Sequence, residues 1–311
     1  MTHLDHKFVA PKKYSLTAFP AATDQPAGMK ILNEATTPVY PRIIADVPYA
    51  QRGNLTLHLQ IIMPPNATTS SQKFPLLMYV PGSAFHKQNV GEHLVHLAKI
   101  AKLGYVIAVV EYRWAPDDPF PAQIIDFHTA TRFMLAHANR YHVDATKYLA
   151  WGDSSGAHTI VMGALTTQLS DFNAEEPSKQ PLAYQGVIDF YGPTDISRMN
   201  AVPSTQDHTS AHSLEGEFFG SHNLNEIPEQ VQKANPITYI TDQKLPPFLI
   251  MHGNKDRLVP FEQSVLLYNA LQAHHQSVDF YRLTGSDHGT DAFFTPHCLS
   301  IVHNFIQSVF N

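Results

Sequence analysis

The chain has 311 residues, of which 43% are hydrophobic and one is a cysteine. This length and apolar content can bury one sizeable core, and a single cysteine excludes an intrachain disulfide. The formal net charge of -6 gives no basic field, which argues against nucleic acid or an anionic membrane surface as the main partner.

Residues 1–40 contain prolines and many polar side chains, and they show no regular hydrophobic period. This pattern predicts an irregular N-terminal arm, which could contribute to a pocket mouth or to a contact in a homo-oligomer. Neither the arm nor any later stretch contains an apolar run long enough for a signal segment or a membrane span. We therefore expect a cytoplasmic protein with no membrane partner.

From about residue 40 onward, apolar runs of strand length alternate with stretches of helical spacing. The first two runs flank a Gln-Arg-Gly-Asn turn signal and are predicted to pair antiparallel. The later alternation predicts an α/β fold with a mostly parallel sheet, helices on both faces, and functional loops at the carboxyl ends of the strands. The predicted strands are 43–47, 55–63, 74–80, 105–110, 148–151, 184–191, 248–251 and 278–283. The predicted helices are about 90–103, 121–137, 155–168, 261–273 and 292–310.

The regular alternation stops between residue 193 and about residue 235. This segment is polar and too long for a simple connection in a compact domain. We interpret it as a small cap or lid insertion that folds over the active end of the sheet. Since α/β folds of this length are often one domain, residues 1–311 are predicted to form a single domain of which the arm and the cap are parts.

Residues 152–156 read Gly-Asp-Ser-Ser-Gly and lie between a predicted strand and a predicted helix. The glycines let the strand and the helix approach closely, so the hydroxyl of Ser154 is held out at the edge of the sheet. The start of the helix directs unpaired amide groups at the same point. The motif alone occurs by chance, but these flanks favour a nucleophilic serine.

A serine hydroxyl is a poor nucleophile and needs a histidine base whose second nitrogen is held by a carboxylate. In this type of sheet the acid and then the base follow the serine along the chain. Asp256 and His288 each follow a predicted strand, so both are expected at the same edge as Ser154. Asp287 is a weaker candidate for the acid, because adjacent side chains in an extended loop point apart.

Backbone amides should stabilise the oxyanion that forms when such a serine attacks a carbonyl. The amide of Ser155 and amides of the loop 80–85 are the candidates, although an ordinary Pro-Gly turn is the simpler interpretation of that loop. Aromatic residues on loops predicted to face the site are weak candidates for a substrate pocket, since each could equally belong to the core. They are Phe85, Trp114, Phe218, Phe219 and Phe293.

Taken together, these residues resemble the α/β-hydrolase superfamily, and within it small carboxylesterases related to hormone-sensitive lipase and to acetyl-xylan and feruloyl esterase-like enzymes. The similarity extends from about residue 40 to the C-terminus. Besides Gly-Asp-Ser-Ser-Gly, it includes Glu-Tyr-Arg-Trp-Ala-Pro at 111–116 and Pro-Pro-Phe-Leu-Ile-Met-His-Gly-Asn-Lys-Asp at 246–256.

The resemblance implies Ser154 as the nucleophile, Asp256 as the acid and His288 as the base. It also implies that Ser83 and Ala84 stand where the family's His-Gly-Gly-Gly loop supplies oxyanion amides. In this chain the loop reads Pro-Gly-Ser-Ala, which departs from the family pattern. The choice of the two amides therefore stays open.

We predict a serine carboxylesterase that hydrolyses short-chain acyl or small aromatic esters through an acyl-serine intermediate. The expected partner is a small-molecule ester, and no metal or organic cofactor is implied. Two alternatives stay open. One is an amide hydrolase on the same fold, such as a formamidase or a peptidase, and the other, of a different class, is a non-catalytic ligand-binding protein.

Overall fold

The computed structural model describes residues 8–32, 40–65, 67, 71–175 and 180–311. By its contacts the chain divides into two units, Met1–Pro38 and Val39–Asn311, and the predicted boundary of the arm near residue 40 lies close to this division. In its described residues the first unit has one short 3₁₀ helix, η1 (Leu16–Ala18), and irregular backbone elsewhere.

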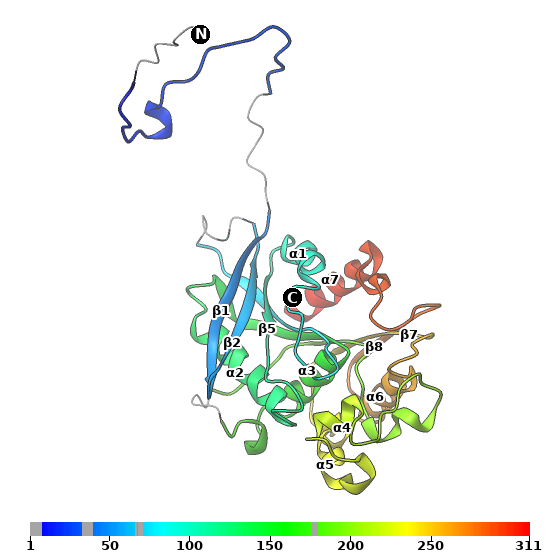
Figure 1. Cartoon of the computed structure of the whole chain (residues 1–311). Helices are drawn as coiled ribbons and strands as arrows, with labels where there is room; N and C mark the ends of the chain where they lie inside the picture. The colour runs from blue at the N-terminus through cyan, green and yellow to red at the C-terminus, as the bar shows by residue number, and fades with distance from the viewer. Residues whose placement is uncertain (1–7, 33–39, 66, 68–70, 176–179) are drawn as a thin grey trace, which may run out of the picture. The chain divides into compact units, whose positions relative to one another are not determined.

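The described residues of the second unit form one eight-stranded sheet with the strand order β1-β2-β4-β3-β5-β6-β7-β8. The first two strands pair antiparallel, and β2 is antiparallel to β4, whereas all neighbours from β4 to β8 run parallel. The predicted antiparallel pair and mostly parallel sheet are thus confirmed (Figure 1). The strands are β1 (Arg42–Arg52), β2 (Leu55–Met63), β3 (Phe74–Val80), β4 (Val106–Val110), β5 (Val143–Asp153), β6 (Val187–Phe190), β7 (Phe248–Gly253) and β8 (Val278–Leu283).

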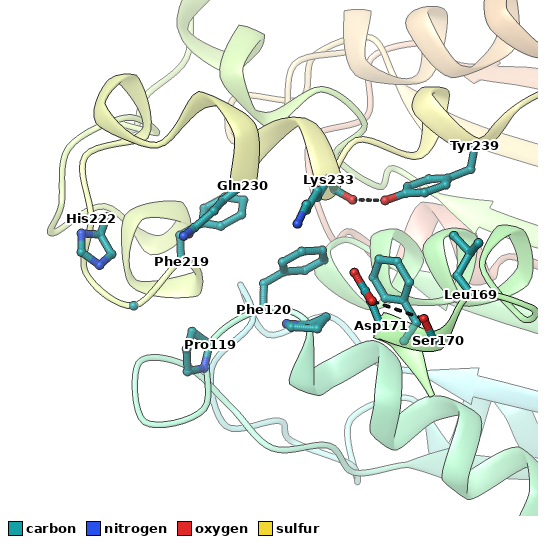
Figure 2. Close-up of a pocket in the computed structure, with 13 residues that line it drawn as sticks. Pro119, Phe120, Leu169, Ser170, Asp171, Phe219, His222, Gln230, Lys233 and Tyr239 are labelled. Carbon is teal, nitrogen blue, oxygen red and sulfur yellow. Dashed lines mark hydrogen bonds between the residues drawn. The ribbon is translucent and has the colours of Figure 1, made fainter. Parts of the chain in front are cut away.

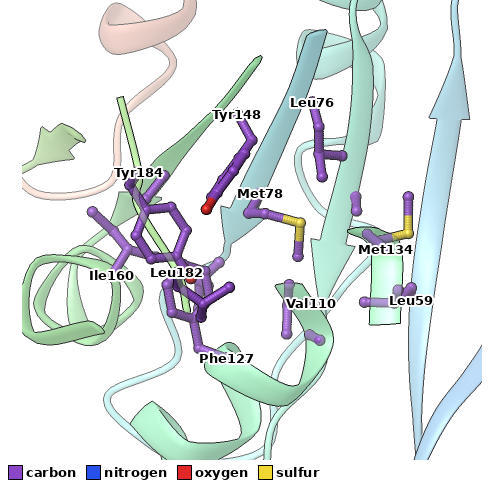
Figure 3. Packing of buried hydrophobic residues seen from close by; sticks show 14 of the residues in the cluster. Leu59, Leu76, Met78, Val110, Phe127, Met134, Tyr148, Ile160, Leu182 and Tyr184 are labelled. Atoms are coloured by element: carbon purple, nitrogen blue, oxygen red, sulfur yellow. The ribbon is translucent and has the colours of Figure 1, made fainter. Parts of the chain in front are cut away.

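Helices cover both faces of the sheet, and each face has its own apolar core. On one face, apolar residues of α2, α3 and α6 belong to one buried cluster with Leu76 and Met78 of β3 (Figure 3). On the other face, apolar residues of α1 and α7 belong to a second cluster with Leu77 and Tyr79 of the same strand. Because both faces are buried, the strand reads as a continuous apolar run rather than as an alternation. The helices are α1 (Leu94–Ala101), α2 (Ala122–Ala136), α3 (Ser155–Leu165), α4 (Leu214–Phe218), α5 (Pro228–Lys233), α6 (Glu262–Ala273) and α7 (Pro296–Phe310).

The prediction of one continuous helix over about 292–310 was wrong in its first turn. The structure has a 3₁₀ helix, η6 (Asp291–Phe294), followed by α7. Thr295 is the N-cap of α7, its hydroxyl accepts a hydrogen bond from the amide of Cys298, and Pro296 occupies the first helical position. Proline has no amide hydrogen to donate, so it begins a helix and does not continue one.

The segment from residue 193 to 235 folds into short helices, and several of its apolar residues belong to one small buried cluster. Phe218, Leu224 and Val231 of this segment pack in one cluster with Phe85, which follows β3, and with Val259, which follows β7. The segment therefore packs on loops at the carboxyl ends of the strands (Figure 1). Its remaining helical turns are η3 (Ile196–Ala201) and η4 (Leu224–Glu226).

The strand order reverses at β3, which lies between β4 and β5 in the sheet. In this order the chain leaves β3 toward one side and passes from β4 to the other. The loops that follow β3 and β5 therefore diverge, which creates a crevice suited to a ligand. Among the helices of the described residues, none is long and apolar enough to cross a membrane.

Candidate active site

Ser154 occupies a sharp bend between β5 and α3, with φ of 51° and ψ of -130°. Residues other than glycine avoid this region, and such a conformation costs about 1 to 3 kcal/mol. The bend needs close backbone contact on both sides. A Cβ atom on Gly156 would lie 2.1 Å from the carbonyl oxygen of Val80, and one on Gly152 would lie 2.7 Å from the backbone of Gly156.

Three side chains from distant parts of the sequence form a hydrogen-bonded chain at this bend. Nε2 of His288 lies 2.9 Å from Oγ of Ser154, and Nδ1 of His288 lies 2.7 Å from Oδ2 of Asp256. The carboxylate fixes the imidazole so that Nε2 faces the hydroxyl, which is the arrangement that makes a serine nucleophilic. The structure thus brings together the three residues on which the sequence analysis depends.

The carboxylate of Asp256 is buried and fully hydrogen-bonded. Its Oδ1 accepts from the amides of Leu258 and Val259, both at 2.9 Å, and Nε2 of His252 lies 3.1 Å from its Oδ2. Burial raises the pKa of Asp256, but hydrogen bonds from His252 and His288 outweigh that effect and hold the pKa below its ordinary value. Asp256 is therefore ionised at neutral pH.

Asp287, the weaker candidate for the acid, has other partners. Its Oδ2 accepts from Nε of Arg257 at 2.7 Å, and its Oδ1 accepts from the backbone amide of His288 at 2.9 Å. The hydrogen bond from Arg257 lowers the pKa of Asp287 to about 2. Asp287 therefore joins the loop that contains Arg257 to its own loop. The hydrogen bonds described for the imidazole nitrogens of His288 are with Asp256 and Ser154.

The loop after β3 passes directly over the nucleophile. A Cβ atom on Gly82 would lie 2.7 Å from Cβ of Ser154, so only glycine fits there. The amide of Ser83 donates to Oγ of Ser155 at 2.9 Å and is already engaged, which conflicts with its predicted role in oxyanion binding. Within the described part of the chain, the amides of Ala84 and Ser155 have no hydrogen-bond acceptor.

Gln88 holds this loop against the sheet, and the sequence analysis missed it. Its Nε2 donates to the carbonyl oxygens of Pro81 and Val110 at 3.1 and 3.2 Å, and its Oε1 accepts from the amide of Tyr112 at 2.9 Å. A lone glutamine eight residues after the end of β3 has no sequence pattern that would identify it. Side-chain hydrogen bonds of Gln88 therefore hold the loop in place, and no local sequence pattern predicts them.

The five aromatic residues predicted to line a substrate pocket fall into different places. Phe85, Phe218 and Phe293 are 1%, 0% and 0% exposed, so their burial conflicts with direct contact to a substrate. The ring of Phe85, in the loop after β3, is stacked on the ring of Phe218 with the centroids 3.8 Å apart. Trp114 is half-buried beneath Lys87, whose Nζ lies 5.3 Å from the indole centroid, and Phe219 lines a cavity.

That cavity has a volume of about 870 Å³ and lies between the start of α2, the turn η2 (Ser170–Phe172) and the segments around α5. Figure 2 shows the rings of Phe120, Phe219 and Tyr239 around it, with the side chain of Lys233 directed between them. Neither Ser154 nor His288 lines it. This cavity is therefore separate from the hydrogen-bonded chain at the bend.

Among the described residues, no group of three or more His, Cys, Asp or Glu side chains is placed to hold a metal ion. At the bend the structure brings together a hydroxyl, an imidazole, a carboxylate and backbone amides. Together these groups can carry out acyl transfer.

Comparison with known proteins gives a consistent result. Residues 59–271 match the sequence profile of the BD-FAE family. Esterase LipC from Mycobacterium tuberculosis is 28% identical over 219 residues, which make up 70% of this chain and 53% of LipC. The match therefore spans only about half the length of that relative.

Two solved structures superpose closely on the chain. A truncated carbohydrate esterase from gut microbiota does so with a TM-score of 0.77 at 23% identity, over 88% of this chain and 98% of that one. A bifunctional GH43-CE protein from Bacteroides eggerthii superposes with a TM-score of 0.76 at 25% identity, over 86% of this chain and 38% of that one.

Proposed function

Because the chain belongs to the BD-FAE family and has the α/β-hydrolase fold, we propose that it is a serine carboxylesterase. In this proposal Ser154 is the nucleophile, His288 the general base and Asp256 the residue that orients the base. The observation that carries it is the unbroken hydrogen-bonded chain from the Ser154 hydroxyl through His288 to Asp256. The same observation disfavours a non-catalytic ligand-binding protein.

The reaction begins when Oγ of Ser154 attacks the ester carbonyl carbon and Nε2 of His288 accepts the hydroxyl proton. The ionised Asp256 stabilises the imidazolium that results. The negative charge on the carbonyl oxygen is stabilised by the free amides of Ser155 and Ala84, of which the first lies at the start of α3, where the helix dipole favours an anion. Ser83 is left out of this role because its amide is engaged.

The tetrahedral intermediate then collapses. The bond to the alcohol oxygen breaks, and His288 returns the proton to that oxygen, which leaves an acyl group on Ser154. A water molecule gives its proton to His288 and attacks the acyl carbon, and the second tetrahedral intermediate releases the carboxylic acid as Ser154 recovers its proton.

We propose short acyl groups, such as acetyl, for the acid half of the substrate. The rings of Phe85, in the loop after β3, and of Phe218 are stacked and buried, and neither Ser154 nor His288 lines the cavity of about 870 Å³. For the alcohol half, the structural relative named a carbohydrate esterase suggests a sugar ester. The esterase names among the relatives also favour esters over the amides of the alternative proposal.

Initial rates on p-nitrophenyl acetate, butyrate and octanoate and on a feruloyl ester test this proposal, with Ser154→Ala as the control. We expect the acetyl ester to have the highest kcat/KM and the control to be inactive. Faster hydrolysis of octanoate would refute the short-chain assignment. Equal rates for the wild type and Ser154→Ala would refute the nucleophile.

A further inference from the structure

Helix α4 contacts the loop that carries the candidate oxyanion amides, although it has only five residues. It is fixed firmly in the insertion. A Cβ atom on Gly216 would lie 2.1 Å from the carbonyl oxygen of Ser210, so the helix packs directly on that backbone. Glu215 is buried, and its Oε2 lies 3.0 Å from Nδ1 of the fully buried His208. These contacts hold the backbone of α4 on both sides of Gly216, next to its second acidic residue, Glu217.

That next acidic residue, Glu217, forms a bridge to His86. Nε2 of His86 lies 2.6 Å from Oε2 of Glu217, and Nδ1 of His86 lies 2.8 Å from the carbonyl oxygen of Ala84. A carbonyl oxygen only accepts hydrogen bonds, so Nδ1 carries a proton. The contact at Nε2 joins the same imidazole ring to the carboxylate of Glu217, so one ring links α4 to the backbone of Ala84.

The bridge ends on a strained turn. Ala84 and Phe85 have φ values of 52° and 64°, in a region that residues other than glycine, asparagine and aspartate seldom adopt. The hydroxyl of Ser83 donates to the carbonyl oxygen of His86 at 2.6 Å, and Phe85 stacks on Phe218 of α4. Because the backbone alone disfavours this turn, contacts such as these determine where the amide of Ala84 points.

From this geometry we propose that His86 and Glu217 are positioning residues for oxyanion stabilisation. His86 holds the carbonyl group of Ala84 and so restrains the backbone of that residue, and Glu217 holds His86 from the insertion. By fixing the backbone of Ala84, the two side chains limit the direction in which its amide points. The proposal rests on the proposed function, since it assigns residues that support that chemistry. Neither residue touches the reacting atoms, and both act through the loop after β3.

The test measures kcat and KM on p-nitrophenyl acetate for Glu217→Ala, Glu217→Gln, His86→Ala and the double variant His86→Ala/Glu217→Ala. Rates are normalised to active sites titrated with a fluorophosphonate, so that misfolded protein does not count. The affinity for a trifluoromethyl ketone, which forms an oxyanion on the serine, is measured in parallel. Glu229→Ala, on an exposed residue of α5, is the matched control.

We expect Glu217→Ala and His86→Ala each to lower kcat about 10- to 100-fold with KM changed less than about twofold, because a misdirected amide weakens the transition state more than the bound ester. Affinity for the ketone should fall by a similar factor. The double variant should lose no more than either single variant, since both remove one bridge. Glu217→Gln should recover most of the rate, because its amide group still bonds the imidazole.

Two results would overturn the proposal. One is a kcat per titrated site within about twofold of the wild type in both alanine variants, in an enzyme that Ser154→Ala inactivates. The other is additive losses in the double variant. A wild type with no ester hydrolysis and no titration would instead remove the proposed function itself, and the positioning roles with it.

Discussion

Replacing Ser154 by glycine should abolish activity and make the protein more stable than the alanine variant. Ser154 has φ of 51° and ψ of -130°, which glycine adopts readily and alanine does not. Both substitutions remove the nucleophile and the hydrogen bond to Nε2 of His288. The comparison between them therefore isolates the strain of the bend.

The size of the difference follows from two opposing effects. Relief of the strained conformation is worth about 1 to 3 kcal/mol. Glycine offsets about 0.5 to 1 kcal/mol of this gain, because it loses more backbone freedom on folding. Taking the middle of each range, about 2 less about 0.75 kcal/mol, we expect Ser154→Gly to have a free energy of unfolding larger by just over 1 kcal/mol than that of Ser154→Ala.

In a chain of this size such a difference corresponds to a rise in Tm of roughly 2 to 6 °C. Differential scanning calorimetry of the two variants in the same buffer at one scan rate measures it directly. A Tm of Ser154→Gly equal to or below that of Ser154→Ala would refute the idea that the bend is strained. Residual hydrolysis by either variant would show that another group attacks the ester.

Three further changes test other parts of the site. A Cβ atom on Gly82 would lie 2.7 Å from Cβ of Ser154, so Gly82→Ala should shift the loop and lower kcat at least about 100-fold. Asp256→Asn should lower kcat by roughly 10³ to 10⁴ with little change in KM, because it disturbs the tautomer of His288. Burial lowers the pKa of His158 to about 4. Between about pH 4 and pH 6.5 the unfolded chain therefore binds more protons than the folded protein, and the free energy of unfolding decreases as the pH falls through that range. His158→Gln should reduce the difference between the free energies of unfolding at pH 7 and pH 4.5, measured in urea, by roughly 2 to 3 kcal/mol.

Each of these three predictions has an outcome that would contradict it. Wild-type kcat in Gly82→Ala would mean that the loop can move away from the nucleophile without consequence. A kcat for Asp256→Asn within about tenfold of the wild type would assign the acid elsewhere. An unchanged pH dependence of stability in His158→Gln would place the acid sensitivity in other groups.

The sheet and the order of its candidate residues could be predicted because they depend on local patterns. Central parallel strands are buried on both faces, so they read as apolar runs, and β3 and β7 were located in this way. The residues that follow parallel strands gather at one edge, which is how Asp256 and His288 were selected. Their hydrogen bonds to each other and to Ser154 agree with that selection.

What could not be predicted depends on contacts between distant residues. The amide of Ser83 is engaged only because the side chain of Ser155 turns toward it, across 72 residues. Phe85 and Phe218 look the same in sequence whether they line a pocket or stack in a core, and their burial decides for the core. The bridge between His86 and Glu217 spans 131 residues and has no local signature.

The most direct test of Ser154 as the nucleophile is mass spectrometry of the protein after reaction with a fluorophosphonate. We predict one covalent adduct, on the peptide that contains Ser154, formed by the wild type and absent from Ser154→Ala. Folded wild-type protein that forms no adduct, or that carries the label on another residue, would contradict the assignment.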